Sequence, residues 1–163
     1  MDRISKLIGL FIINFWVCGC TSLRPATSLK YGKIDSYKYI YITPTNSLTS
    51  SSGATVSGQY YSSTKTVNPC DVISGTLTKE GLIRLPELKP ELTDETLIIN
   101  YGESGRRNTG LGGYTIEVTI QFISAKNSSL VCSCTAEGQG STEADDIRLA
   151  ITRCLNELMP KRN

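Results

Sequence analysis

Apolar and polar residues alternate most regularly in the segment GYTIEVTIQFIS, which runs from Gly113 to Ser124. A period of two residues places one set of side chains on each face of a β-strand. The apolar set is Tyr114, Ile116, Val118, Ile120 and Phe122, and the polar set is Thr115, Glu117, Thr119 and Gln121. We therefore expect a strand with one face in the core and the other in water or against a partner.

Three more segments have the composition of strands. YKYIYIT (37–43) is aromatic and β-branched on both faces, which favours a buried strand, and ETLIINYG (95–102) is a compact apolar run. LVCSCTAEG (130–138) places Leu130, Cys132, Cys134 and Ala136 on one face. Residues 44–67 are dominated by Ser, Thr, Gly and Tyr, which favours an exposed loop in which GQYYSST forms at most a short edge strand.

Two segments carry helix signals. In NPCDVISGTLTKEGL, Asn68 is a suitable N-cap, Pro69 suits the first helical position and Gly81 suits the end. In STEADDIRLAITRCLNEL (141–158), one apolar stripe runs along a helix. The stripe consists of Ile147, Ile151, Cys154, Leu155 and Leu158.

The order β-α-β-β-β-α predicts an α+β domain over residues 36–160. We expect a mainly antiparallel sheet of about four strands, with two helices packed on one face. Residues 20–35 hold few apolar side chains and include Pro25 and Gly32, so we expect this range to be a tether.

The chain begins like an exported protein. Arg3 and Lys6 precede an apolar run of about ten residues, which is far short of the roughly 20 that a membrane-spanning helix needs. The following Val17-Cys18-Gly19-Cys20 resembles a bacterial lipobox. This resemblance implies that residues 1–19 are a signal peptide and that Cys20 is diacylated and becomes the mature N-terminus. The alternative is an ordinary secretory signal with a chance cysteine.

The residues after Cys20 bear on the destination of the chain. Thr21 in place of Asp resembles the outer-membrane sorting pattern, and no acidic run that would indicate surface export follows the cysteine. We therefore expect a lipid-anchored protein at the outer membrane that faces the periplasm.

Composition narrows the classes of function. Without residues 1–19 the chain keeps 144 of its 163 residues, with 15 basic against 14 acidic side chains, a net charge of +1. A nearly neutral domain of this kind disfavours a nucleic-acid partner. The chain has no histidine, which argues against triad hydrolases and catalytic zinc. We expect no catalytic residues, metal or cofactor.

Four cysteines remain beside the lipobox, and in an exported chain they favour disulfides. Cys132 and Cys134 stand about 7 Å apart on one strand face, at or beyond the bridging limit, so they should not pair with each other. We expect one of them to reach Cys154 and the other to reach Cys70. Buried free thiols are the main alternative, and a zinc site fits the spacing poorly.

Two charged groups are candidates for contact with a partner. Arg106 and Arg107 lie in the glycine-rich connection 102–113, where guanidinium groups could bind carboxylates or phosphates, although such arginines are usually only solvated. Glu143, Asp145 and Asp146 crowd the start of the last helix. Gly138 and Gly140 precede these acids as in dinucleotide-binding loops, but the third glycine is missing, so a capped helix start is the better interpretation.

The lipobox, the segments YKYIYI and TLIINYGESGRRNTGLGGYTIEVTIQF, and the closing GSTEADDIRLAITRCL together resemble small uncharacterised Gram-negative cell-envelope lipoproteins. Their layout is similar to that of envelope-assembly and transport-accessory lipoproteins. The resemblance implies a non-enzymatic accessory protein with an envelope protein partner. Two alternatives stay open: a ligand-binding or enzymatic domain that joins the arginines to the acidic helix start, and a surface adhesin or glycan binder that uses Tyr60 and Tyr61.

Overall fold

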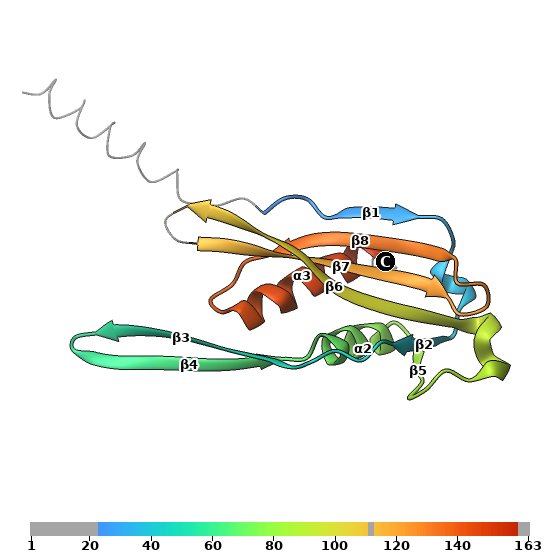
Figure 1. Cartoon of the computed structure of the whole chain (residues 1–163), viewed down its shortest axis with the longest axis horizontal. Coiled ribbons are helices and arrows are strands. Elements are labelled where there is room, and N and C mark those ends of the chain that lie inside the picture. The colour runs from blue at the N-terminus through green and yellow to red at the C-terminus, as the bar shows by residue number, and fades with distance from the viewer. Residues whose placement is uncertain (1–22, 111–112, 160–163) are drawn as a thin grey trace, which may run out of the picture.

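The computed structural model describes residues 23–110 and 113–159, which form one six-stranded sheet, a separate two-stranded hairpin and two α-helices (Figure 1). The expected signal peptide (1–19) and Cys20 lie outside the described residues. The strands are β1 (Thr27–Lys30), β2 (Tyr39–Ile42), β3 (Leu48–Val56), β4 (Gln59–Val67), β5 (Ile83–Arg84), β6 (Thr96–Gly110), β7 (Gly113–Ser124) and β8 (Leu130–Gly138). The helices are α2 (Pro69–Lys79) and α3 (Glu143–Leu158), with short 3-10 turns η1 (Ile34–Ser36) and η2 (Pro90–Glu95). Within the described ranges, no helix is long and apolar enough to cross a membrane.

The expected fold, an antiparallel sheet of about four strands, is wrong. The sheet has the strand order β1-β8-β7-β6-β2-β5 and is mixed, because β2 pairs in parallel with both β5 and β6. The chain leaves β2 through the β3–β4 hairpin and α2 before it returns to β5, and such a long connection permits parallel pairing. The order of elements along the chain does not distinguish this arrangement from an antiparallel one.

Strand β1 lies within the range 20–35 that was expected to be a tether. It pairs antiparallel with β8, from Thr27 opposite Thr135 to Lys30 opposite Cys132. Its residues are mostly exposed, so the strand is held by backbone hydrogen bonds to the edge of β8 rather than by an apolar face. A strand of this kind leaves no apolar alternation in the sequence.

The range 44–67, expected to be a loop, supplies the long β3–β4 hairpin. Thr49 hydrogen-bonds to Thr66 across the two strands (3.0 Å), and Ser51 does so to Thr64 (3.1 Å). At the turn, Ser57 and Gly58 have φ of 52° and 79°, the two positive values that a tight type I′ turn requires. Because both faces of the ribbon are largely polar, hydrophobic patterning does not reveal it.

Both helices pack on the same face of the sheet and share its core (Figure 1). Helix α2 begins as the sequence predicts, since the Asn68 side chain accepts a hydrogen bond from the Cys70 amide (3.0 Å) and Pro69 is the first helical residue. Gly81 follows the helix with a φ of 93°. In α3 the whole apolar stripe is buried. In β7, Ile116, Val118, Ile120 and Phe122 are buried as expected, whereas Tyr114, the first residue of the apolar set, is 37% exposed.

Leu130 does not lie on the core face where strand alternation places it. The pairing of β7 with β8 shifts between Phe122 and Ile123, so Leu130 lies opposite Ile123. Val131 and Cys132 are consequently both buried, whereas Leu130 is half-buried. A bulge of this kind adds one residue and reverses the faces beyond it.

The four described cysteines are buried free thiols, so the two expected disulfides are absent from the structure. Cys70 lies near the opposite edge of the sheet, where its sulfur accepts a hydrogen bond from Arg84 of β5 (3.1 Å). Cys132 and Cys134 lie on β8, which strands β7, β6 and β2 separate from β5. In contrast, the thiols of Cys134 and Cys154 contact each other, and this contact together with burial raises the pKa of Cys154.

We expect oxidation of the purified protein to link Cys134 to Cys154 and to leave Cys70 and Cys132 free. The reason is proximity, since the first two thiols are in contact across the β8–α3 interface. Peptide mapping without reductant, after alkylation in denaturant, measures the pairing. A bridge that includes Cys70, or a Cys132–Cys134 bridge, would contradict the structure.

Candidate functional site

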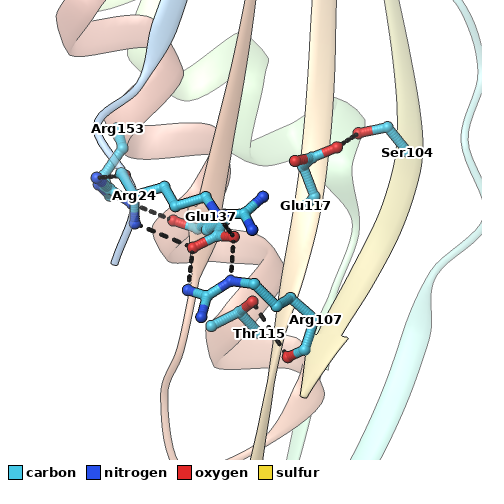
Figure 2. A network of polar contacts seen from close by, with 7 residues as sticks. All are labelled: Arg24, Ser104, Arg107, Thr115, Glu117, Glu137 and Arg153. Atoms are coloured by element: carbon cyan, nitrogen blue, oxygen red, sulfur yellow. Dashed lines mark hydrogen bonds and ion pairs between the residues drawn. The ribbon is translucent and has the colours of Figure 1, made fainter. Parts of the chain in front are cut away.

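A buried carboxylate at the end of β8 gathers charged groups from distant parts of the chain. The Glu137 side chain is 3% exposed and accepts two hydrogen bonds from Arg107 of β6, at 2.7 and 2.6 Å. The backbone amide of Arg24 donates a third hydrogen bond at 3.0 Å, and the Nε of Arg24 lies 3.7 Å from the carboxylate. Figure 2 shows the two guanidinium groups on either side of Glu137.

Arg153 of α3 completes this network. Its guanidinium donates one hydrogen bond to the backbone carbonyl of Glu137 and another to that of Arg24, the latter at 2.6 Å (Figure 2). We call Arg24, Arg107 and Arg153 around Glu137 the arginine cluster. The cluster joins the start of the described chain, β6, β8 and α3, four segments that lie far apart in the sequence.

The arginine cluster keeps Glu137 ionised. The hydrogen bonds from Arg107 are the largest cause, and the Arg24 amide and both positive charges add to them, so the pKa of Glu137 is lowered to about 2 although burial acts in the opposite direction. The same contact raises the pKa of Arg107. Three guanidinium groups and one carboxylate carry a net charge of +2, and the Arg24 side chain is 66% exposed.

An open recess of about 410 Å³ lies beside the cluster. It is lined by Arg24, Gly105, Arg106, Arg107, Asn108, Glu117 and Glu137. Glu117 accepts a hydrogen bond from Ser104 at 2.9 Å (Figure 2). With Arg107 occupied by Glu137, Arg24 is the guanidinium best placed to meet an anionic group from outside the domain.

The glycine-rich connection 102–113 is not a loop, since β6 continues to Gly110 and β7 begins at Gly113. Its two arginines therefore point to opposite faces of the sheet. Arg107 pairs with Glu137, whereas Arg106 donates a hydrogen bond to Glu143 at the start of α3 and lies 5.2 Å from the centre of the Tyr114 ring. Of the residues proposed from the sequence to share a site, the structure joins Arg106 to Glu143.

The other two acids of the helix start have structural partners. Asp145 forms an ion pair with Lys65 of β4 at 2.8 Å, and hydrogen bonds from Lys65, Ser141 and Thr142 lower its pKa to about 2. Asp146 is buried and accepts a hydrogen bond from the Gly140 amide, and burial raises its pKa. These contacts agree with the interpretation of a capped helix start.

Gly138 and Gly140 allow α3 to approach the end of β8. A Cβ atom at Gly138 would lie 1.8 Å from the carbonyl oxygen of Asp146, and one at Gly140 would lie 2.5 Å from the Cβ of Asp145. The two glycines that suggested a dinucleotide loop are therefore explained by close packing between strand and helix. Among the described residues, no group of three acids or cysteines is placed to hold a metal ion.

Comparison with known proteins finds similarity to solved structures but not to a protein family. No family model matches the chain, and no curated protein matches it. A solved structure of the PelC dodecamer from Paraburkholderia phytofirmans matches with a TM-score of 0.49 and 15% identity, over 83% of this chain and 96% of that chain. A dodecamer of the same protein with one leucine replaced by methionine gives a TM-score of 0.46 at 15% identity, over 82% of this chain and 92% of that one. Neither value is high enough to carry a functional argument.

Sequence reasoning missed the arginine cluster. Glu137 was part of an expected strand, and Arg24 and Arg153 belong to segments expected to be a tether and a helix. Arg24 and Glu137 are 113 positions apart, so their contact leaves no local signal. Of the four residues, only Arg107 was a candidate from the sequence.

We expect Glu137→Gln to lower the free energy of unfolding by about 2 kcal/mol at pH 7, because hydrogen bonds from charged donors to a buried group are lost or weakened. The folded pKa lies below the ordinary value of 4.5, so the stabilisation is present above about pH 4.5 and is lost as the pH falls toward 2. Urea unfolding across this range measures the difference between the two proteins.

The matched control is Glu117→Gln, because Glu117 lies directly opposite Glu137 on β7 and has a single hydroxyl donor, Ser104. Its effect should stay within about 0.5 kcal/mol at pH 7. Equal effects of the two substitutions on the free energy of unfolding would contradict the stabilising role assigned to the buried Glu137 carboxylate.

We expect Gly138→Ala to lower the free energy of unfolding by about 2 to 3 kcal/mol, because the new methyl group meets backbone atoms of α3. Gly102→Ala on β6 is the control, since a Cβ there has no neighbour within 4 Å. Urea unfolding again gives the measurement. A Gly138→Ala protein as stable as the control would show that α3 does not pass this close to β8.

Proposed function

We propose that the protein is a non-enzymatic lipoprotein, anchored through Cys20 to the periplasmic side of the outer membrane, whose domain binds a partner in the cell envelope. The observation that carries this proposal is the sequence Val17-Cys18-Gly19-Cys20, which follows a short apolar run with basic residues before it. Two acyl chains on one residue supply the membrane affinity that a single chain lacks.

The position of Arg24 supports the anchoring role. It is four residues beyond Cys20, and its backbone is bonded to Glu137 and Arg153. The folded domain therefore begins almost at the lipidated residue. Four residues span at most roughly 14 Å, so a lipid on Cys20 holds the domain close to the membrane surface rather than at the end of a long tether.

The open face of the sheet supports a binding role. Both helices pack on one face, so the other is left uncovered across the described strands (Figure 1). Tyr41, Ile98 and Ile123 are neighbours on this open face and are half-buried. Toward the two edges, Ile83 is 50% exposed and Leu29 is 51% exposed. A row of apolar side chains on an uncovered sheet is typical of a surface that contacts another protein.

The anchor is tested by labelling with radioactive palmitate in a Gram-negative host. Cys20→Ala should abolish the label, because the acylated residue is gone. Cys18→Ala is the matched control and should keep full labelling, since alanine is small enough for the second place of a lipobox. Equal labelling of the Cys20→Ala protein and the unaltered protein would refute the proposal.

A further inference from the structure

The β3–β4 hairpin extends well beyond its contacts with the rest of the domain. Its base is held by the ion pair of Lys65 with Asp145 and by a hydrogen bond from the Ala144 amide to the Ser50 hydroxyl (2.9 Å). The strands then continue for six more residues, from Ser50 to Val56, which is about 20 Å of extended chain. An isolated two-stranded ribbon is marginally stable in water, so an arm of this length is better stabilised by a surface that it contacts.

The tip of this hairpin is aromatic and exposed. Tyr60 is 71% exposed, Tyr61 is 59% exposed and Val56 beside the turn is 58% exposed. The Tyr60 ring lies across Gly53 of the opposite strand, where a Cβ atom would meet its hydroxyl oxygen at 2.2 Å. The glycine thus gives the ring a fixed place on the ribbon. Tyrosine, apolar along its ring and polar at its hydroxyl, is enriched where lipid meets water.

The arginine cluster lies toward the same end of the domain. Figure 1 shows the tip of the β3–β4 hairpin, the end of β6 and the start of β1 all toward the left end. The cluster has a net charge of +2, which Glu117 in the same recess lowers to +1, and its most exposed member, Arg24, is 66% exposed. The neighbouring charges Arg106 and Lys65 are neutralised by Glu143 and Asp145. The surplus positive charge therefore lies near the point where the chain arrives from Cys20.

We propose that this end of the domain rests on the phospholipid surface in which Cys20 is anchored. Tyr60, Tyr61 and Val56 enter the interfacial region, and the arginine cluster faces the lipid phosphates. The proposal rests on the lipidation of Cys20 proposed above, because the short connection to Arg24 is what brings this end to the membrane. The proposal also defines how the domain is oriented on the membrane. The hairpin tip is a second contact with the membrane, and the open sheet face points sideways, where a partner can bind it.

The chain offers a direct test by fluorescence. Its one tryptophan, Trp16, lies in the expected signal peptide, so Tyr60→Trp gives a mature protein with a single indole. The lipidated protein is placed in phosphatidylglycerol vesicles whose acyl chains carry bromine near the head group. Bromine quenches only an indole that reaches the interface, so we expect at least about twofold stronger quenching for Tyr60→Trp than for a control variant away from the membrane.

Tyr31→Trp is that control, because Tyr31 is 70% exposed but follows the opposite end of β1 (Figure 1). Equal quenching of the two variants, or no quenching of Tyr60→Trp, overturns the proposal. Quenching of Tyr60→Trp that is equally strong in phosphatidylcholine vesicles overturns the part assigned to the arginine cluster. If the indole of Tyr60→Trp is shielded from a soluble quencher only after envelope proteins are added, the hairpin tip contacts a protein partner. This result also overturns the proposal.

Failure of lipidation gives a different result. If Cys20 is not processed, the protein retains Trp16 and its mass lacks the acyl chains, and mass spectrometry detects both. The orientation is judged on protein whose mass shows the lipid, so an unquenched indole in that protein contradicts the orientation and leaves the anchor intact.

Discussion

Glu137 is a carboxylate that the fold buries, and the arrangement around it follows from the need to keep it ionised. Taking a charge out of water costs several kcal/mol unless cations and hydrogen bonds replace the water. Arg107 and the Arg24 amide supply these bonds, and Arg153 binds the adjacent carbonyls. Such a buried pair adds little net stability compared with apolar packing, but it allows few other arrangements. The start of the chain is consequently fastened to β8 and α3.

This fastening bears on the proposed lipid anchor at Cys20, which would hold the protein by its mature N-terminus. A flexible N-terminal segment would let the domain tumble above the membrane, whereas a segment fixed at Arg24 limits the domain to a few orientations. The glycines at the end of β8 contribute, because they let α3 approach closely enough for Arg153 to reach the Glu137 carbonyl. The open sheet face would then have a defined direction relative to the proposed anchor, as the proposed binding role requires.

Elements with a buried apolar face could be predicted from the sequence, and the others could not. The stripe in α3 and, apart from Tyr114, the alternation in β7 mark residues that are buried, and Asn68 caps α2 as expected. Strands β1, β3 and β4 present few apolar residues to the core, so patterning does not mark them. The parallel pairing of β2 and the contacts of Glu137 depend on residues far apart in sequence. Charged residues that looked free, such as Arg107 and Asp145, are engaged in holding segments together.

The most direct test of this account is an NMR titration of the Arg24 backbone amide in the intact protein. The account predicts that this amide is protected from hydrogen exchange at neutral pH and that its resonance shifts with the ionisation of Glu137, with a midpoint near pH 2. An Arg24 amide that exchanges as fast as in an unfolded peptide, together with a Glu137 carboxyl that titrates near its ordinary value of 4.5, would contradict it.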